Sequence, residues 1–197
     1  MAKTLLQLSG ADLKPTPLSQ GVLVLIDIQN EYFDGPLRLD GVEDAERVAA
    51  GLLARARKAG TPVIHIRHKG KAGGAFDPDA PRGAIHDSVA PEPGETIIDK
   101  GLPNSYAGTT LAKALAAHPD RQPILAGFQT HMCLSATARS AVDHGAMPTV
   151  VMDAAATRAL PDPTAGTELS AAEIHRAALA ALADRFAVVA RAGDIPD

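Results

Sequence analysis

The chain of 197 residues has no tryptophan, only two tyrosines and four phenylalanines, and a single cysteine. Because aromatic rings are so scarce, the core must be built from alanine, leucine, valine and isoleucine. One cysteine cannot form an internal disulfide, which is typical of a reducing compartment and favours a cytoplasmic location. The chain also lacks any apolar run near the roughly 18 residues that span a bilayer, and its N-terminal apolar stretch is too short for a signal peptide.

An excess of positive charge is absent too. Lysine and arginine number 19 against 23 aspartates and glutamates, which gives a formal net charge of −4 at pH 7. Proteins that bind nucleic acids or anionic membranes are expected to carry a basic face. We therefore expect no nucleic-acid partner and no membrane partner, and the length fits one domain better than two.

What is present is a regular alternation of two kinds of segment. Short, continuously apolar runs are typical of strands buried on both faces, and they occur at 21–27, 61–67, 95–99, 122–128, 148–153 and 186–191. Amphipathic patterns typical of helices lie at 41–60, 108–118, 131–145 and 170–185. This alternation predicts a three-layer, Rossmann-like α/β fold with a mostly parallel sheet of about six strands. We expect one domain over residues 21–197, preceded by an arm over residues 1–20 that lies on the domain or on a neighbouring subunit.

Residues 69–94 interrupt this alternation. They show no hydrophobic periodicity and are dense in glycine and proline. Irregular loops of this length inside compact domains often act as lids or binding loops. We expect this segment to shape a ligand pocket, either as a mobile lid or as an interface element.

In an open parallel sheet, ligands bind beyond the carboxyl ends of the strands. The polar residues that follow the first five predicted strands are Asp27, His68, Lys100, Cys133 and the pair Asp153 and Thr157. Asp27, Lys100 and Cys133 form a chemically coherent set. A thiol at a helix start beside a lysine is easier to ionise, and a neighbouring carboxylate can take its proton and pass it on. Backbone N–H groups around residues 129–133 would then face a developing oxyanion.

Each of these three residues also has an ordinary structural interpretation. A lone buried cysteine is often small apolar filler. Asp27 could bond a nearby helix terminus, and Lys100 could be a solvated loop residue. Their position at the strand ends does not decide between a catalytic and a structural role.

Three stretches of the sequence resemble one known family. They are "LVLIDIQNEYF" (23–33), "PGETIIDKGLPNSYAGTTL" (93–111) and the long, specific "LAGFQTHMCLSATARSAVDHGAMPTVVMDAAATR" (125–158). In these stretches, within about residues 21–190, the chain is similar to the isochorismatase-like cysteine hydrolases, which include isochorismatases, nicotinamidases and other small-amide hydrolases.

The resemblance implies a catalytic triad of Asp27, Lys100 and Cys133. It also implies a cis peptide bond between Phe128 and Gln129, and an oxyanion hole formed by the N–H groups of Gln129 and Cys133. In the implied reaction, Cys133 attacks an amide carbonyl with help from Asp27, ammonia or an amine leaves, and water cleaves the thioester. The partners would be a small-molecule substrate and water, and the family commonly forms homodimers or homotetramers.

Departures from the family pattern narrow the choice of reaction. The metal-binding D-x-H spacing of nicotinamidases is absent, and Asp77 and Asp79 flank Pro78 in what resembles a solvated turn. We therefore expect no metal and no cofactor. Isochorismatases that cleave a vinyl ether do not need a cysteine, so Cys133 favours hydrolysis of a C–N bond. An ether hydrolase remains one alternative, and a non-catalytic ligand-binding or redox-sensing protein on the same fold is another.

The resemblance also suggests which residues contact the substrate. Gln29 and Phe33 would support or wall the site, and Asn104 and Tyr106 resemble a polar and aromatic pair that faces the substrate. His68, at a strand end, would either contact the substrate or be structural, and His131 would either line the pocket or face a subunit partner. His175, on an alanine-rich helix, is expected to be a packing or interface residue.

Overall fold

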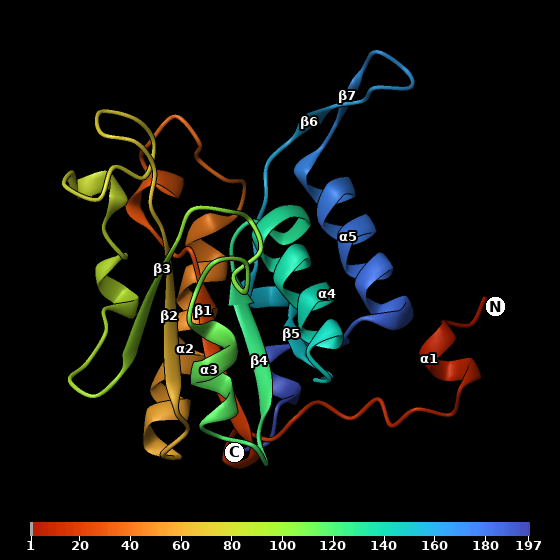
Figure 1. Cartoon of the computed structure of the whole chain (residues 1–197). Coiled ribbons are helices and arrows are strands. Elements are labelled where there is room, and N and C mark those ends of the chain that lie inside the picture. Colours follow the sequence, from red (N-terminus) through yellow and green to blue (C-terminus); the bar gives the residue numbers. More distant parts are fainter. Residues whose placement is uncertain (1) are drawn as a thin grey trace.

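The computed structural model describes residues 2–197, and its centre is a six-stranded sheet (Figure 1). In spatial order the strands are β3 (Thr96–Lys100), β2 (Val63–His68), β1 (Gly21–Ile26), β4 (Gln122–Gly127), β5 (Thr149–Val151) and β8 (Val188–Ala190). Every neighbouring pair in this sheet is parallel. The predicted α/β fold with about six parallel strands is confirmed.

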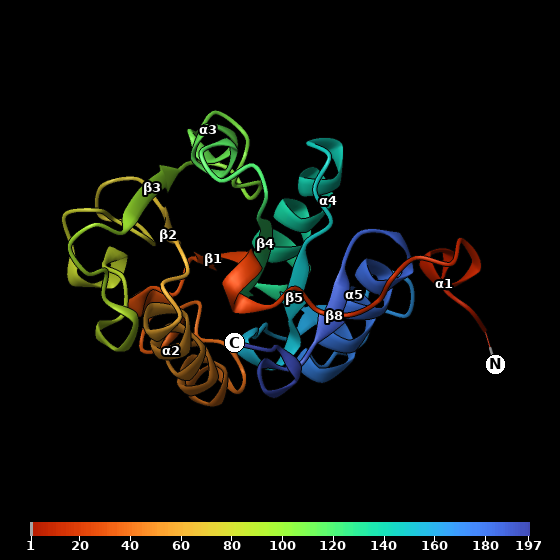
Figure 2. The same ribbon diagram turned by 90° about the horizontal axis from the view of Figure 1, so that it is seen from below.

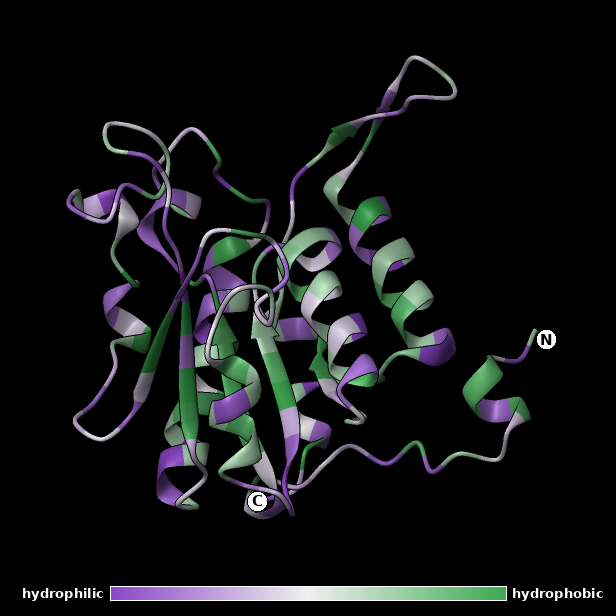
Figure 3. Cartoon of the chain, in the orientation of Figure 1, coloured by the Kyte–Doolittle hydropathy of each residue, from purple (hydrophilic) through white to green (hydrophobic). Residues whose placement is uncertain are grey.

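Helices cover both faces of the sheet (Figure 2). Helix α2 (Val42–Lys58) packs on one face, while α3 (Leu111–Ala116), α4 (Ser135–Asp143) and α5 (Ala171–Arg185) pack on the other. Successive side chains of a strand point to opposite faces, so Leu23 and Leu25 meet α2 while Val24 and Ile26 meet the other layer. This two-sided burial explains the continuously apolar strands, which stand out as green arrows in Figure 3.

Some predicted elements differ from the structure. Strand β3 is not buried on both faces, because it is the edge strand, and the Ile97 side chain is half exposed there. The predicted helix 131–145 is divided into a π-helical turn (Thr130–Leu134) and α4. A small hairpin of β6 (Leu160–Pro161) and β7 (Glu168–Leu169) projects from the body in Figure 1, and its two-residue strands are too short to show alternation. Within residues 2–197, no helix combines the length and apolar character that crossing a membrane requires.

Residues 2–20 run along the chain's own domain. Helix α1 (Leu5–Leu8) lies against α5, and the Leu5 N–H donates to the Asp184 carboxylate at 2.8 Å. Further along, the Leu18 N–H donates to the Pro196 carbonyl at 2.8 Å, which ties the arm to the C-terminal segment.

The loop at 69–94 is held to the domain by buried apolar side chains. Phe76 and Val89 pack into the cluster on the α2 side of the sheet. The Asp77 carboxylate accepts hydrogen bonds from the N–H groups of Gly73 (2.6 Å) and Asp79 (3.0 Å). Asp77 therefore stabilises its own turn, as expected around Pro78.

The strand order reverses direction between β1 and β4, and in open α/β sheets ligands bind in a crevice at such a point. From β1 the chain adds β2 and then β3 on one side, whereas β4, β5 and β8 are added on the other. The connections from β1 and β4 therefore leave the sheet in opposite directions, which opens a space beyond their carboxyl ends. Residues that follow β1 and β4 are the ones placed to act there.

Candidate active site

Asp27 follows β1 directly and turns the chain at the crevice. Its φ of +52° lies in the left-handed region, where aspartate is one of the few side chains commonly found. Its N–H donates to the Ile66 carbonyl of β2 at 3.0 Å, so the turn is fixed to the sheet. The Asp27 side chain is fully buried.

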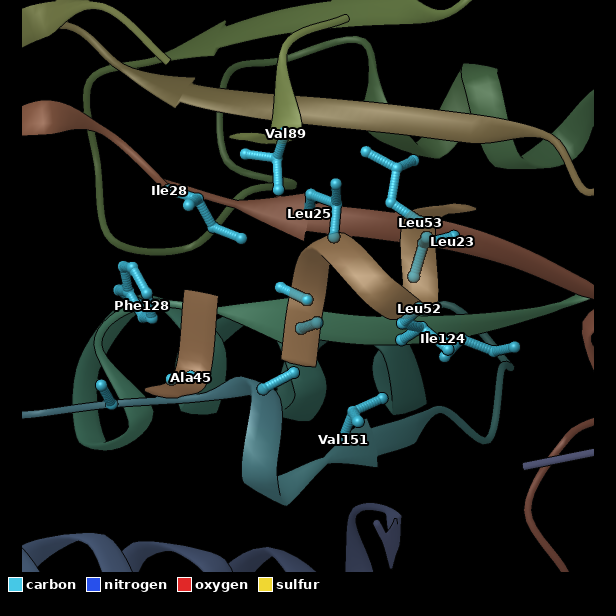
Figure 4. Close-up of a cluster of buried hydrophobic side chains, with 14 of the residues drawn as sticks. Leu23, Leu25, Ile28, Ala45, Leu52, Leu53, Val89, Ile124, Phe128 and Val151 are labelled. Atoms are coloured by element: carbon cyan, nitrogen blue, oxygen red, sulfur yellow. The ribbon is translucent and has the colours of Figure 1, made fainter. Parts of the chain in front are cut away.

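The chain leaves β4 through an equally constrained turn. Gly127 has a φ of +117°, and a Cβ at this position would lie 2.1 Å from the Ile26 carbonyl oxygen. The next N–H, of Phe128, donates to that same oxygen at 2.8 Å. The Phe128 ring is buried in the cluster on the α2 side, near Ile28 (Figure 4). The peptide bond between Phe128 and Gln129 is cis, in agreement with the family resemblance.

Gly127→Ala is expected to destabilise the protein by at least about 2 kcal/mol, because the new Cβ meets backbone and φ is unfavourable for alanine. Urea denaturation followed by circular dichroism measures this change. Gly51→Ala is the matched control, because Gly51 lies within α2 and a Cβ there meets no atom within 4 Å. That variant should gain up to about 1 kcal/mol, and equal destabilisation by both variants would contradict the role of Gly127.

Cys133 lies in the π-helical turn that follows. The N–H groups of Met132 and Leu134 both donate to the Gln129 carbonyl, at 3.0 and 3.2 Å. The turn is also tied to the segment after β5, because the Thr130 N–H donates to the Ala156 carbonyl at 3.0 Å. Single π turns are rare and occur often at functional sites. Within residues 2–197 the Gln129 N–H has no hydrogen-bond partner, so it is available to a bound oxygen atom.

Lys100, at the end of β3, joins the two turns. Its Nζ lies 2.7 Å from Asp27 Oδ2 and 3.3 Å from Cys133 Sγ. All three side chains are buried. The structure thus brings together the three residues that the strand-end argument singled out.

Burial dominates the protonation of this cluster. It raises the pKa of the Cys133 thiol to about 12, and the Asp27 charge acts in the same direction while Lys100 opposes both. Burial likewise raises the pKa of Asp27, against the opposing charge of Lys100. Burial therefore opposes the ionisation that the helix start and the lysine favour. A nucleophilic attack then depends on Asp27 taking the thiol proton.

Comparison with known proteins places this site in a family. The family model described as the isochorismatase domain matches residues 21–194. The chain belongs to the isochorismatase family. The crystal structure of an isochorismatase from Pseudomonas putida has 40% identity and a TM-score of 0.95, over 99% of this chain and 100% of that chain.

Two further proteins are similar in sequence to this isochorismatase-family chain. The isochorismatase family protein YddQ of Bacillus subtilis is 39% identical over 85% of this chain and 93% of its own length. The maleamate amidohydrolase of Pseudomonas putida is 34% identical over 66% of this chain and 70% of its own length. The chain is a hydrolase of this family.

Tyr32 is a residue of this hydrolase's site that the sequence analysis missed. Its buried ring packs edge to face against Phe76 and Phe128, with ring centroids 5.0 and 5.7 Å away. Burial, followed by the charges of Asp27 and Cys133, raises the pKa of the Tyr32 hydroxyl, so it stays protonated and can donate. The signal was available, because Tyr32 lies in the same "DIQNEYF" stretch as Asp27.

Arg158 is a second missed residue. It is half-buried, and its Nε is buried without a hydrogen-bond partner among the described residues. No acidic side chain within residues 2–197 forms an ion pair with it. Burial, and then the charge of Arg158, lower the pKa of His131, and Arg158 also acts on Tyr32. Among residues 2–197, Arg158 is therefore a half-buried cation without a counter-ion, and its charge acts on His131 and Tyr32.

The structure also defines the neighbours of His131 and Phe33, two of the expected substrate contacts. His131, two residues before the cysteine, is half-buried with Nδ1 2.6 Å from Thr157 Oγ1. Phe33 is half-buried and stacks on His86, with ring centroids 4.1 Å apart. His175, expected to be a packing or interface residue, supports the π-helical turn, with its Nδ1 2.9 Å from Thr130 Oγ1.

Gln29 has a supporting position, because its side chain is fully buried and its amide is already paired within the protein. Its Oε1 accepts from the His68 N–H, while Nε2 donates to the carbonyls of His68 and Gly83. Gln29 therefore fastens the end of β2 and the long loop to the turn after β1.

Asn104 and Tyr106 also depart from the prediction. Asn104 Oδ1 accepts from the Tyr106 N–H at 2.9 Å, which closes a local turn. The Tyr106 ring stacks on His144, with centroids 4.4 Å apart, and lines a groove at the far end of α4. The Tyr106 ring is therefore held at the C-terminal end of α4, whereas Cys133 precedes the N-terminal end of this helix.

Proposed function

We propose that this family member hydrolyses the C–N bond of a small amide or ureido compound, with Cys133 as the nucleophile. The observation that carries the proposal is the fully buried Lys100 Nζ between Asp27 Oδ2 (2.7 Å) and Cys133 Sγ (3.3 Å). Such a cluster provides a nucleophile, a base and a compensating cation in one place. The relative named maleamate amidohydrolase supports the same chemistry.

The first half of the proposed reaction forms a thioester. As Cys133 Sγ attacks the amide carbon, its proton moves to Asp27, and Lys100 offsets the negative charge that develops on sulfur. The carbonyl oxygen becomes an oxyanion, for which the free N–H of Gln129 is a donor. The tetrahedral intermediate then collapses, Asp27 returns the proton to the nitrogen, and ammonia or an amine leaves.

The second half releases the acid. A water molecule attacks the thioester carbon while Asp27 takes one of its protons. The same N–H donor stabilises the second oxyanion, and the C–S bond breaks as the carboxylic acid forms. Asp27 returns the proton to Cys133 Sγ, which restores the starting state. Tyr32 remains protonated throughout and provides a fixed polar wall.

Ammonia release tests this function. The panel should contain maleamate, other dicarboxylic acid monoamides, ureido acids, and neutral aliphatic and aromatic amides, each with wild type and Cys133→Ala. The proposal predicts release from at least one compound by wild type and none by the variant. Absence of cysteine-dependent release across the panel would overturn it and favour a binding protein. Cleavage of a vinyl ether that survives Cys133→Ala would favour the ether hydrolase.

Arg158 narrows the proposed substrate to amides that also carry a carboxylate, because it is a half-buried cation without a counter-ion. Arg158→Met should lower kcat/KM for maleamate about 100-fold, which corresponds to losing one charge-assisted hydrogen bond. For the neutral amide of the same acid the loss should be less than about threefold. Steady-state assays of both substrates measure the difference, and an equal loss for the two would contradict a carboxylate contact.

A further inference from the structure

The Lys100 ammonium has three N–H donors. The proposed reaction assigns a role to the partners of only two of them. Asp27 and Cys133 are those two. The third partner is His68, whose Nδ1 lies 3.2 Å from Lys100 Nζ. Nothing in the proposed reaction accounts for this contact, and the sequence left open whether His68 contacts the substrate or is structural.

The sheet itself sets the pairing of His68 and Lys100. They are register partners at the ends of the adjacent parallel strands β2 and β3. Side chains at paired positions of neighbouring strands share a face and lie about 5 Å apart. The contact is therefore built into the backbone and does not depend on a loop conformation.

His68 is also fixed by its other neighbours. Its N–H donates to Gln29 Oε1 at 2.8 Å, and its carbonyl accepts from Gln29 Nε2 at 2.9 Å. Its ring packs edge to face on Phe76, with centroids 5.2 Å apart. The buried Gln29 thus holds the histidine that contacts the lysine.

The protonation state of His68 follows from this contact. An imidazole nitrogen that accepts from an ammonium carries no proton, so the proton is on Nε2 and the ring is neutral. Burial and the positive charge of Lys100 lower the pKa of His68, against the opposing charge of Asp27. Phe76, from the long loop, adds only an apolar surface.

We propose that His68 is a positioning residue, which binds the third N–H of Lys100 and holds the ammonium against Asp27 and Cys133. This inference rests on the proposed function for its catalytic consequence. Without His68, one N–H of a fully buried ammonium would lose its partner, and the flexible lysine stem would no longer be fixed at the sulfur.

Alkylation of Cys133 by iodoacetamide tests this proposal without a substrate, because the chain has no other cysteine. The rate is measured from pH 6 to pH 10 in wild type, His68→Leu and His68→Asn. Leucine removes the acceptor, whereas the asparagine side-chain oxygen can take the place of Nδ1. We expect His68→Leu to slow alkylation about tenfold at pH 8, a rise of about one unit in thiol pKa, and His68→Asn to stay within about threefold of wild type.

Two outcomes would overturn the proposal. Wild-type alkylation in both variants would show that the lysine needs no third acceptor, and a raised KM alone would then assign His68 to the substrate. Equal slowing in both variants, with lowered unfolding temperatures, would show an ordinary packing role. If asparagine rescues alkylation but no amide is hydrolysed by wild type, the positioning role stands and the proposed function fails.

Discussion

Replacing Cys133 with serine is expected to lower kcat for any amide substrate by at least about 10⁴-fold. A serine hydroxyl is far less acidic than a thiol, and the base proposed to take its proton is the Asp27 carboxylate, which is a weak base beside the Lys100 ammonium. Asp27 is thus matched to a sulfur nucleophile. Sensitive ammonia detection at high enzyme concentration measures the residual rate.

Cys133→Ser also offers a clean structural control. The new hydroxyl is nearly the size of the thiol and can hydrogen-bond to the same buried neighbours, so the unfolding temperature should stay near that of wild type. A folded serine variant that retains more than about a tenth of the wild-type kcat would contradict the requirement for a sulfur nucleophile at position 133.

Asp27→Asn is expected to slow amide hydrolysis and, at the same time, to lower the pKa of the Cys133 thiol. Hydrolysis should fall about 10³-fold, because no group remains to carry the proton between sulfur, nitrogen and water. The rate at which Cys133 is alkylated should increase instead. The Asp27 charge helps to raise the thiol pKa to about 12, so removing it lowers that pKa while Lys100 stays. Below the pKa, alkylation becomes about tenfold faster for each unit of decrease.

The pH dependence of alkylation measures this prediction directly. The asparagine curve should be displaced toward lower pH relative to wild type, while the amide assay shows almost no turnover. Loss of turnover with a thiol that titrates as in wild type would contradict direct electrostatic coupling between Asp27 and Cys133. Lys100→Met provides the opposite control, because losing the cation should displace the alkylation curve toward higher pH.

The alternation of strands and helices could be predicted, because a strand buried on both faces is a continuous run of apolar residues. Continuous apolar runs located the central strands, and the strand-end rule then selected Asp27, Lys100 and Cys133. The edge strand β3 was predicted to be buried on both faces because residue order carries no information on which strands lack a second neighbour. Strand order is decided by long-range packing.

The side-chain environment was harder to predict, and for a physical reason. The helix start and the lysine near Cys133 are visible in the sequence, but the burial that outweighs them is a property of the whole fold. Tyr106 was expected beside the substrate because it follows Lys100 closely, yet the direction of its ring is set by packing on His144. Arg158 comes directly after Thr157, and only the structure shows that it lacks a counter-ion.

The central claim is that an acyl group is transferred to Cys133 during turnover. It is tested most directly by acid quenching wild type with an amide substrate in the first turnover, followed by intact-mass and peptide mass spectrometry. The account predicts a mass gain equal to the acyl group, confined to the peptide that contains Cys133 and lost as the substrate is consumed. Turnover without such an adduct, at an undiminished rate in Cys133→Ala, would contradict it.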